Sequence, residues 1–522
     1  MNNSAAPIAF PDRRAGWRAW IDTAPSSPAA LAIILIVALA LVPIPYGWNG
    51  NEENYLLLAY RWWAPLTASP FDAVVDHGAS GGKFLAFSLF GLAVSLLGFE
   101  LGRLALTVLL IGLLACGLTR LSRAFGLSAI QALTALALFC LTRQSVMGGE
   151  WILVTAEAKS FAYAFAMLAL ANAVELRPVR TTVYAGVSFY LLFLIGAFWF
   201  AAALVGFVLA GGRWRVALAM VAVFMIAAAP LLLTLIDVQR QFASTPAPSG
   251  LPHADYIYAA LRAPHHLAPF AAEGGWGALR IGAGVFTSVA MAAIAACAWW
   301  RARNRREQAL AVLTGLLSLY PLVALAVSWL DREDLVLAKL YLFRPLSLIL
   351  LLGLMLSMWL WPRLLSAWAQ RWPIAGRGWV KNLPAFVAVP VFLAFALAGA
   401  LTGQAPSISP ATMRMIATVR QLTRPGDVIF AEPATDQTIS LERRLERPTL
   451  ANWQFVPTNP ADLYRWWQLV EDRNRVFAGD CHAIPQRVNY LLVTAATAAR
   501  VVGCGRVVWR DANYSLVEPA LR

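Results

Sequence analysis

Residues 29–46 read AALAIILIVALALVPIPY and contain no charged side chain. A membrane-spanning helix needs about 20 consecutive, mostly apolar residues, so this stretch predicts a first span. Further apolar runs lie at residues 103–119, 128–147, 159–176, 182–195, 197–211, 216–236, 281–300, 308–328, 341–361 and 383–402. The fold class that follows is an α-helical polytopic membrane protein with about eleven transmembrane helices.

The composition of the whole chain agrees with this class. Of its 522 residues, 59% are apolar and 13% are charged, whereas soluble proteins are typically about 45–50% apolar and about 25% charged. An ordinary cytosolic enzyme and a disordered protein are therefore excluded. The net charge of +14 does not call for nucleic acid as a partner, because basic loops beside spans are explained by topology and by the headgroups of membrane lipids.

Basic residues in the short connections predict the orientation. With the N-terminus inside, every short inner connection carries at least two of them, as in Arg120 and Arg123, which the positive-inside rule requires. Reading residues 182–211 as one helix would break this pattern, so we expect two helices separated at Gly196. The segment Phe84–Phe99 is not counted as a span, because its crossing would place Arg120 and Arg123 outside; it is expected to lie on the outer leaflet.

With an odd number of spans, the two ends of the chain lie on opposite sides of the membrane, and the chain has three parts. Residues 1–28 form a cytoplasmic segment, and residues 29–402 form the transmembrane domain with outer loops at 47–102, 237–280 and 329–340. Residues 403–522 are then periplasmic, in the inner membrane of a bacterium. Their soluble composition predicts a small α/β domain with strands near 427–431, 490–493 and 507–509, and a helix at 460–473 capped by Asn459.

Two cysteines of this tail, Cys481 and Cys504, lie 23 positions apart. A disulfide between them is expected in an oxidising compartment, and the alternative is two free thiols. A zinc pattern and a CxxC motif are absent from the sequence.

Acidic residues follow the first span directly, at Glu52 and Glu53. A carboxylate near the membrane surface can act as a general base. Neighbours on a helix point about 100° apart, so we expect only one of the pair to face a cavity. The alternative is a solvated helix start, where the dipole favours acids.

Further polar residues mark the later outer loops. Glu157 and Lys159 lie two positions apart at the mouth of the fourth span and do not share a helix face, so each is expected to serve a different partner; the alternative is an interfacial pair. The sequence Arg262-Ala263-Pro264-His265-His266 predicts a rigid cationic corner suited to a phosphate. Arg344, before Pro345, is a second candidate phosphate contact. This pattern requires no cofactor. A divalent metal ion is the cofactor that the two histidines could bind.

The order of these features resembles the GT-C superfamily of integral membrane glycosyltransferases. The matching features are Glu52-Glu53 before Tyr55, the interfacial segment Phe84–Phe99, the corner from Gly98 to Arg103, the acidic Glu157, the broken helices at 182–211 and a closing periplasmic domain. Many members carry Asp-Glu at the first position, where this chain has Asn51 and Glu52. No WWD-type motif of oligosaccharyltransferases is present.

The resemblance implies an inverting transfer of a sugar from a polyprenyl-phosphate donor to a glycan, lipid or protein acceptor at the periplasmic face. Glu52 or Glu53 would take the acceptor proton, and Glu157 would position the acceptor or the base. The lipid phosphate would be held by Lys159, Arg262, His265, His266 and Arg344.

Two alternatives from other classes stay open. One is a transporter or flippase subunit for a polysaccharide or lipid, although the chain shows neither an internal repeat nor mid-bilayer charges. The other is a non-catalytic membrane scaffold. Convergence of the acidic residues and the basic loop into one site would favour the enzyme.

Overall fold

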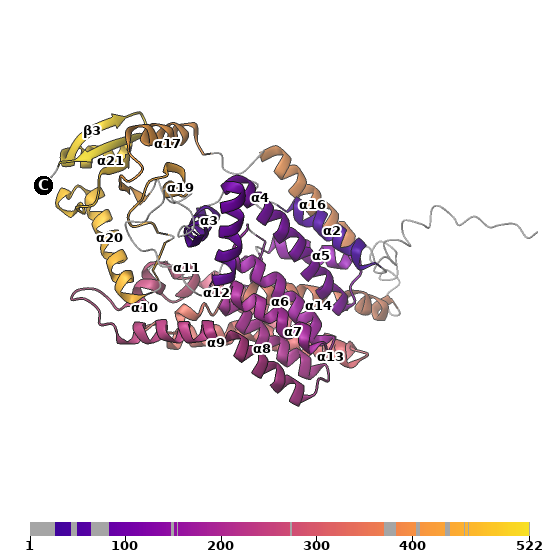
Figure 1. The fold of residues 1–522 in the computed structure, drawn as a ribbon. Coiled ribbons are helices and arrows are strands. Elements are labelled where there is room, and N and C mark those ends of the chain that lie inside the picture. Colours follow the sequence, from indigo (N-terminus) through magenta and orange to yellow (C-terminus); the bar gives the residue numbers. More distant parts are fainter. Residues whose placement is uncertain are drawn as a thin grey trace, which may run out of the picture.

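The computed structural model describes residues 27–42, 50–63, 83–142, 144–147, 151–153, 155–271, 274–369, 383–402, 408–433, 439–453, 455–457 and 459–520. Each apolar run expected to span the membrane coincides with a helix (Figure 1). These helices are α2 (Pro28–Leu41), α4 (Phe84–Phe125), α5 (Ala129–Leu141), α6 (Ala158–Val174), α7 (Pro178–Leu191), α8 (Phe193–Leu209), α9 (Trp214–Ser244), α12 (Ala278–Arg301), α13 (Arg305–Leu330), α14 (Leu346–Ala369) and α16 (Leu383–Thr402).

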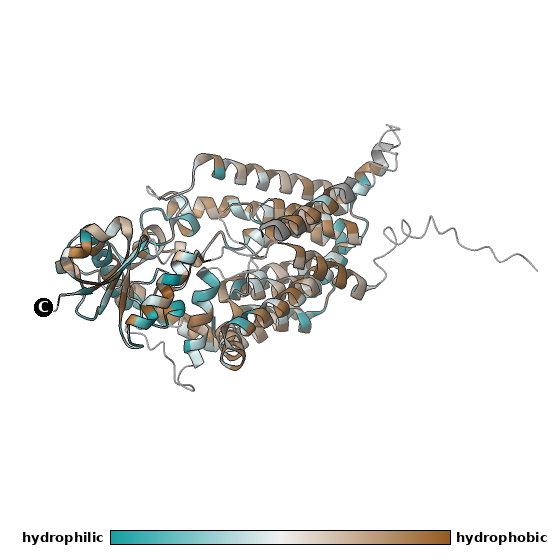
Figure 2. Cartoon of the chain, turned by 90° about the horizontal axis from the view of Figure 1, so that it is seen from above, coloured by the Kyte–Doolittle hydropathy of each residue, from teal (hydrophilic) through white to brown (hydrophobic). Residues whose placement is uncertain are grey.

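The fold defines the class of a polytopic helical membrane protein. Within the described residues, five helices are long and apolar enough to cross a membrane: α4, α9, α12, α13 and α14. The shorter helices pack with them into one apolar bundle, which Figure 2 shows in brown beside the more mixed C-terminal part. Eleven crossings remain a prediction, since length and composition support five of them.

Residues 182–211 form two helices, but the break differs from the expected one. The chain is extended at Leu192, with φ −156° and ψ 105°, and this residue separates α7 from α8. Gly196 lies inside α8, where an added Cβ would stand 2.2 Å from Phe189 Cα of α7. The glycine thus allows the two helices to pack closely instead of separating them.

Helix α4 contains the predicted corner. Gly98 has φ 74° and ψ 171°, a backbone conformation that interrupts the helix and that glycine adopts without strain. The apolar segment expected at the outer leaflet therefore ends at this kink, and the remainder of α4 continues as a second helix. Its position relative to the membrane stays a prediction.

The C-terminal domain is built on a four-stranded sheet of order β1-β2-β4-β3. Its strands are β1 (Ile429–Ala431), β2 (Tyr490–Thr494), β3 (Gly505–Arg510) and β4 (Tyr514–Pro519), with β1 parallel to β2 and the other pairs antiparallel. The helices are α17 (Pro410–Leu422), α19 (Leu441–Leu445), α20 (Pro460–Ala478) and α21 (Ala495–Val501). Helix α20 begins after Asn459, whose side chain accepts a hydrogen bond from the Asp462 amide, as a cap should. Strand β4 was not expected from the sequence.

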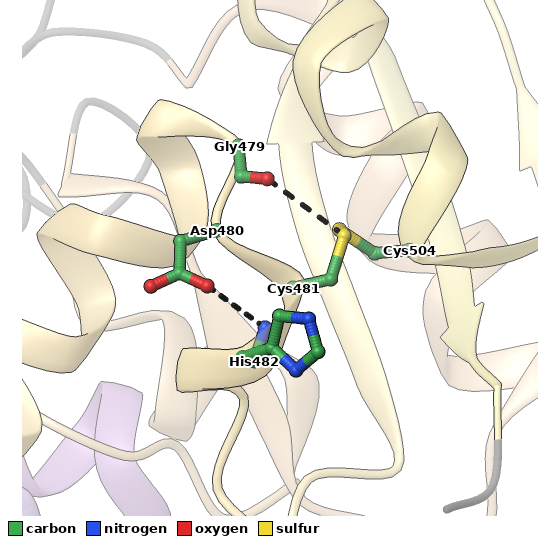
Figure 3. The surroundings of a disulfide bond; sticks show 5 residues. All are labelled: Gly479, Asp480, Cys481, His482 and Cys504. Atoms are coloured by element: carbon green, nitrogen blue, oxygen red, sulfur yellow. Dashed lines mark hydrogen bonds between the residues drawn. A yellow bond between two sulfur atoms is a disulfide. The ribbon is translucent and has the colours of Figure 1, made fainter.

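A disulfide joins Cys481 to Cys504 (Figure 3), and their Cα atoms lie 5.1 Å apart. Next to it, the Asp480 side chain accepts a hydrogen bond from the His482 amide at 3.0 Å. The bond closes a loop over a sequence separation of 23, which stabilises the domain by about 3 kcal/mol in the chain-entropy model.

The predicted orientation can be tested at two exposed positions on opposite sides. Arg303→Cys should be shielded from a membrane-impermeant thiol reagent added outside intact spheroplasts, and Gln468→Cys should react. Both substitutions are made in a chain whose free cysteines are replaced, namely Cys116, Cys140 and Cys297. Reaction at position 303 and protection at 468 would reverse the topology.

Candidate active site

Helix α3 (Gly50–Trp63) is the element around which the candidate site is built. It lies between α4 of the membrane part and α19 of the C-terminal domain (Figure 1). Its first turn carries Glu52 and Glu53, and both side chains are fully buried. A buried carboxylate is stable only with partners, and the two residues have different ones.

Glu53 is bound by the C-terminal domain. Its Oε2 accepts a hydrogen bond from the Ser440 amide at 2.8 Å. Its Oε1 accepts from Arg443 Nη2 at 3.0 Å and from Arg444 Nε at 2.9 Å. Two guanidinium groups and an amide hold this carboxylate, so the geometry gives it a docking role and favours Glu52 as the base.

Glu52 lies on the side of α3 that faces the membrane part. Its Oε1 accepts a hydrogen bond from the Ala156 amide at 3.4 Å, and its Oε2 lies 3.8 Å from Arg103 Nη1. Burial raises the pKa of Glu52 to about 7, although Arg103 and the amide hydrogen bond oppose the shift. The nearby carboxylates of Glu157 and Glu53 raise this pKa further. A carboxyl group with this pKa can accept and release a proton at neutral pH.

Glu157 and Lys159 form an ion pair, with 3.2 Å between Oε2 and Nζ. The two side chains therefore contact each other, which agrees with the alternative of a pair, and a separate partner for each stays a prediction. Glu157 is the cap residue before α6 and has an extended backbone, so the helical geometry that separates side chains at i and i+2 does not apply to it.

Three further cations lie near this ion pair, and together with Lys159 we call them the cation cluster: Lys83, Lys159, Arg262 and Arg344. Lys83 precedes the first residue of α4, and its Nζ lies 4.2 Å from the centre of the Tyr55 ring. Burial lowers the pKa of Lys83 to about 7, and the charges of Arg344, Arg262 and Lys159 contribute to the shift. Like charges that influence one another in this way repel, and an anion bound among them would relieve the repulsion.

Two tyrosines support the arginines of the cluster. The hydroxyl groups of Tyr258 and Tyr341 lie 3.0 Å apart, and Arg262 forms a hydrogen bond with Tyr341. The guanidinium carbon of Arg344 lies 3.7 Å from the centre of the Tyr341 ring. Tyr341 has a left-handed backbone with φ 50°, a strained conformation for a bulky residue that is typical of functional sites.

The paired histidines lie next to each other on their loop. His265 is exposed and His266 is half-buried, and their rings lie 4.1 Å apart. The backbone carbonyl of His265 accepts a hydrogen bond from Trp276 Nε1 at 2.9 Å. No group of three metal-ligating side chains is found in the part of the chain that the structure describes.

The structure thus brings together most of the residues singled out in the sequence. Glu157 connects the two groups of residues. Its charge influences Glu52, and it also influences Lys83 together with the charges of Lys159, Arg262 and Arg344. Sequence reasoning missed Lys83 and the supporting tyrosines. Lys83 could have been noticed in the sequence, because lysine is rare in this chain: only four of its 42 basic residues are lysines.

Comparisons with known proteins found similar solved structures. No protein-family model matches the sequence, and no protein of curated function does either. Among the similar solved structures is ArnT from Cupriavidus metallidurans in the apo state, with a TM-score of 0.40 and 13% identity, over 97% of this chain and 98% of that one. Another is the archaeal oligosaccharyltransferase AglB from Archaeoglobus fulgidus, in complex with an inhibitory peptide and a dolichol-phosphate. Its TM-score is 0.48 with 11% identity, over 91% of this chain and 70% of that one.

Both structures belong to the superfamily that the sequence resembles. The TM-scores and identities are low, however, so neither activity is transferred to this chain. A function has to be argued from the site itself.

Proposed function

We propose that the protein is a membrane glycosyltransferase that moves a sugar from a polyprenyl-phosphate donor to a hydroxyl group of an acceptor at the periplasmic face. The observation that carries the proposal is the placement of a buried carboxyl group, Glu52, near Glu157, which is paired with Lys159 of the cation cluster. The carboxyl group supplies a base with a pKa of about 7, and the cluster supplies a site for a lipid phosphate.

The transfer balances with these groups alone. The acceptor hydroxyl gives its proton to Glu52, and its oxygen forms a bond to the anomeric carbon of the sugar. The bond between that carbon and the phosphate oxygen breaks, and the electron pair leaves with the phosphate. Negative charge grows on the leaving phosphate, where Lys83, Arg262 and Arg344 stabilise it. Attack from the side opposite the phosphate inverts the anomeric centre.

The class of donor follows from the setting of the site. It is formed at the starts of two apolar helices, because Lys83 immediately precedes α4 and Glu157 immediately precedes α6. A phosphate carried on a membrane lipid reaches such a place by diffusing in the bilayer. The acceptor is a glycan, lipid or protein.

The proposal is tested by comparing cells that carry the wild-type gene, no gene, or the Glu52→Gln variant. Loss of function should leave a polyprenyl-phosphate sugar unconsumed and remove one sugar from an envelope glycan, glycolipid or glycoprotein. Mass spectrometry of extracted lipids and glycans measures both changes. Identical lipid and glycan profiles in all three strains would contradict a transferase role.

The pH dependence of the purified enzyme should be bell-shaped. Glu52 must be deprotonated to act as a base, so activity should rise through pH about 7. Lys83 must be protonated to hold the phosphate, so kcat/KM should fall again as pH rises above its pKa of about 7. Lys83→Arg should extend activity to higher pH, because a guanidinium stays charged there. An unchanged alkaline limb in this variant would remove Lys83 from donor binding.

A further inference from the structure

The C-terminal domain binds α3 at Glu53, the residue next to the proposed base. Besides the bonds to Glu53, Arg61 Nη1 lies 3.6 Å from Glu442 Oε1. Asn452 Nδ2 donates a hydrogen bond to Asn54 Oδ1 at 3.4 Å. These contacts come from the beginning of α3 and from its last turn, so the domain holds the helix at both ends rather than at one point.

The same domain also holds the basic loop on the other side of the site. Ala254 of α10 (Ala254–Tyr256) and Ile257 of the π-helix η3 (Ile257–Leu261) are buried in the core of the C-terminal domain. The amide of Ala254 forms a hydrogen bond with the Tyr464 hydroxyl of α20. The chain then continues through η3 to Arg262 of the cation cluster. Figure 1 shows α3 and α10 approached by α19 and α20 respectively.

We propose that the C-terminal domain aligns the two halves of the site, and that Glu53, Arg443 and Arg444 are positioning residues for the transfer. This inference rests on the proposed function and deepens it. The three side chains reach no reacting atom, but they fix α3, and Glu52 is the adjacent residue on that helix.

The physical reason lies in the adjacency of the two carboxylates. The orientation of Glu52 follows the rotation of α3, which the bonds to Glu53 set. Without these bonds α3 can rotate, and water can reach the space around Glu52. A misplacement of about 1 Å at a reacting group can cost about 10²-fold in rate.

The test uses the full-length enzyme with Arg444→Ala and with Arg443→Ala combined with Arg444→Ala. We expect kcat to fall by about 10- to 100-fold, with KM for the donor nearly unchanged because Lys83 and Arg344 belong to the membrane part. The acidic limb of the pH profile should move below pH 7, toward the ordinary carboxyl value of 4.5. A loss of folded protein would lower activity without moving this limb.

Two further variants complete the design. Arg444→Lys retains the charge at that position and should restore much of the rate. Arg506→Ala removes an exposed ion pair with Glu518 on the sheet of the same domain and should change neither kcat nor the pH profile. Unchanged kcat and an unchanged acidic limb in the double alanine variant would overturn the inference.

A measurement without activity separates this inference from the proposed function. A hydrophobic carbodiimide labels protonated, buried carboxyl groups, and peptide mass spectrometry reports labelling at Glu52 as a function of pH. The groups that face Glu52 are Arg103 of α4, Glu157 before α6 and Glu53 of α3.

Labelling of Glu52 should disappear near pH 7 in the wild type and at lower pH in the double variant. Where the two labelling curves coincide, the positioning role is refuted. Full activity of Glu52→Gln would instead refute the proposed function and leave the labelling result in force.

Discussion

Glu52→Gln should lower kcat by about 10²- to 10⁴-fold, the usual contribution of a general base. The substitution keeps the shape of the side chain and removes its ability to accept the acceptor proton. KM for the donor should change little, because the cation cluster is left intact. Initial rates with purified protein and a polyprenyl-phosphate sugar measure both parameters.

The same substitution should make the protein more stable above neutral pH. Burial raises the pKa of Glu52 in the folded protein from 4.5 to about 7, so charging this group costs stability as pH rises between these values. Glutamine carries no charge, and it should recover up to about 3 kcal/mol at a pH of about 8 and nothing at a pH of about 4. Thermal unfolding in detergent at the two pH values measures the difference.

Glu53→Gln is the matched comparison, and its effect on stability should have the opposite sign. It leaves Arg443 and Arg444 without the carboxylate that they bind, which costs about 3 kcal/mol for a broken buried ion pair. An inactive but stabilised Glu52→Gln and a destabilised Glu53→Gln would assign the two roles. A variant pair with equal activity and equal stability would contradict the assignment.

Arg262→Ala should raise KM for the lipid donor by about 10- to 100-fold. Arg262 is a member of the cation cluster, and a hydrogen bond to a charged group contributes about 1.5–3 kcal/mol. Arg262→Lys should recover only part of the affinity, because an ammonium lacks the planar fork of donors. Donor titrations at saturating acceptor give KM and kcat separately.

Arg280→Ala provides the control for this experiment. Arg280 belongs to α12 and stacks on Trp276, with 4.3 Å between the guanidinium carbon and the ring centre. It carries the same charge near the same loop but does not belong to the cation cluster. A similar rise in KM for both variants would point to a general electrostatic effect instead of a phosphate contact.

Local sequence patterns predicted much of this fold. Apolar runs marked the helices, Gly98 marked the kink in α4, and Asn459 marked the start of α20, because each of these signals acts through neighbouring residues. The break at Leu192 was missed, since the glycine used to place it serves helix packing instead.

The site was predicted less completely because its contacts are distant in sequence. Glu52 faces the site, whereas Glu53 is bound by Arg443. This arginine lies 390 positions further along the chain, so local sequence patterns could not reveal the difference. Tyr341 was not singled out, because its left-handed backbone and its contacts with Arg262 and Arg344 leave no pattern in the sequence. The scarcity of lysine, by contrast, could have pointed to Lys83 beforehand.

The bond between Glu53 and Arg444 has a sequence separation of 391, and it bears on how the protein is made. Helix α3 is synthesised early, but its docking partners Arg443 and Arg444 emerge from the ribosome only much later in translation. Until then Glu53 lacks its cations, and the neighbouring base is not held in place. The newly made chain therefore acquires the complete arrangement around Glu52 only after the segment that carries Arg443 and Arg444 has been made and has folded onto α3.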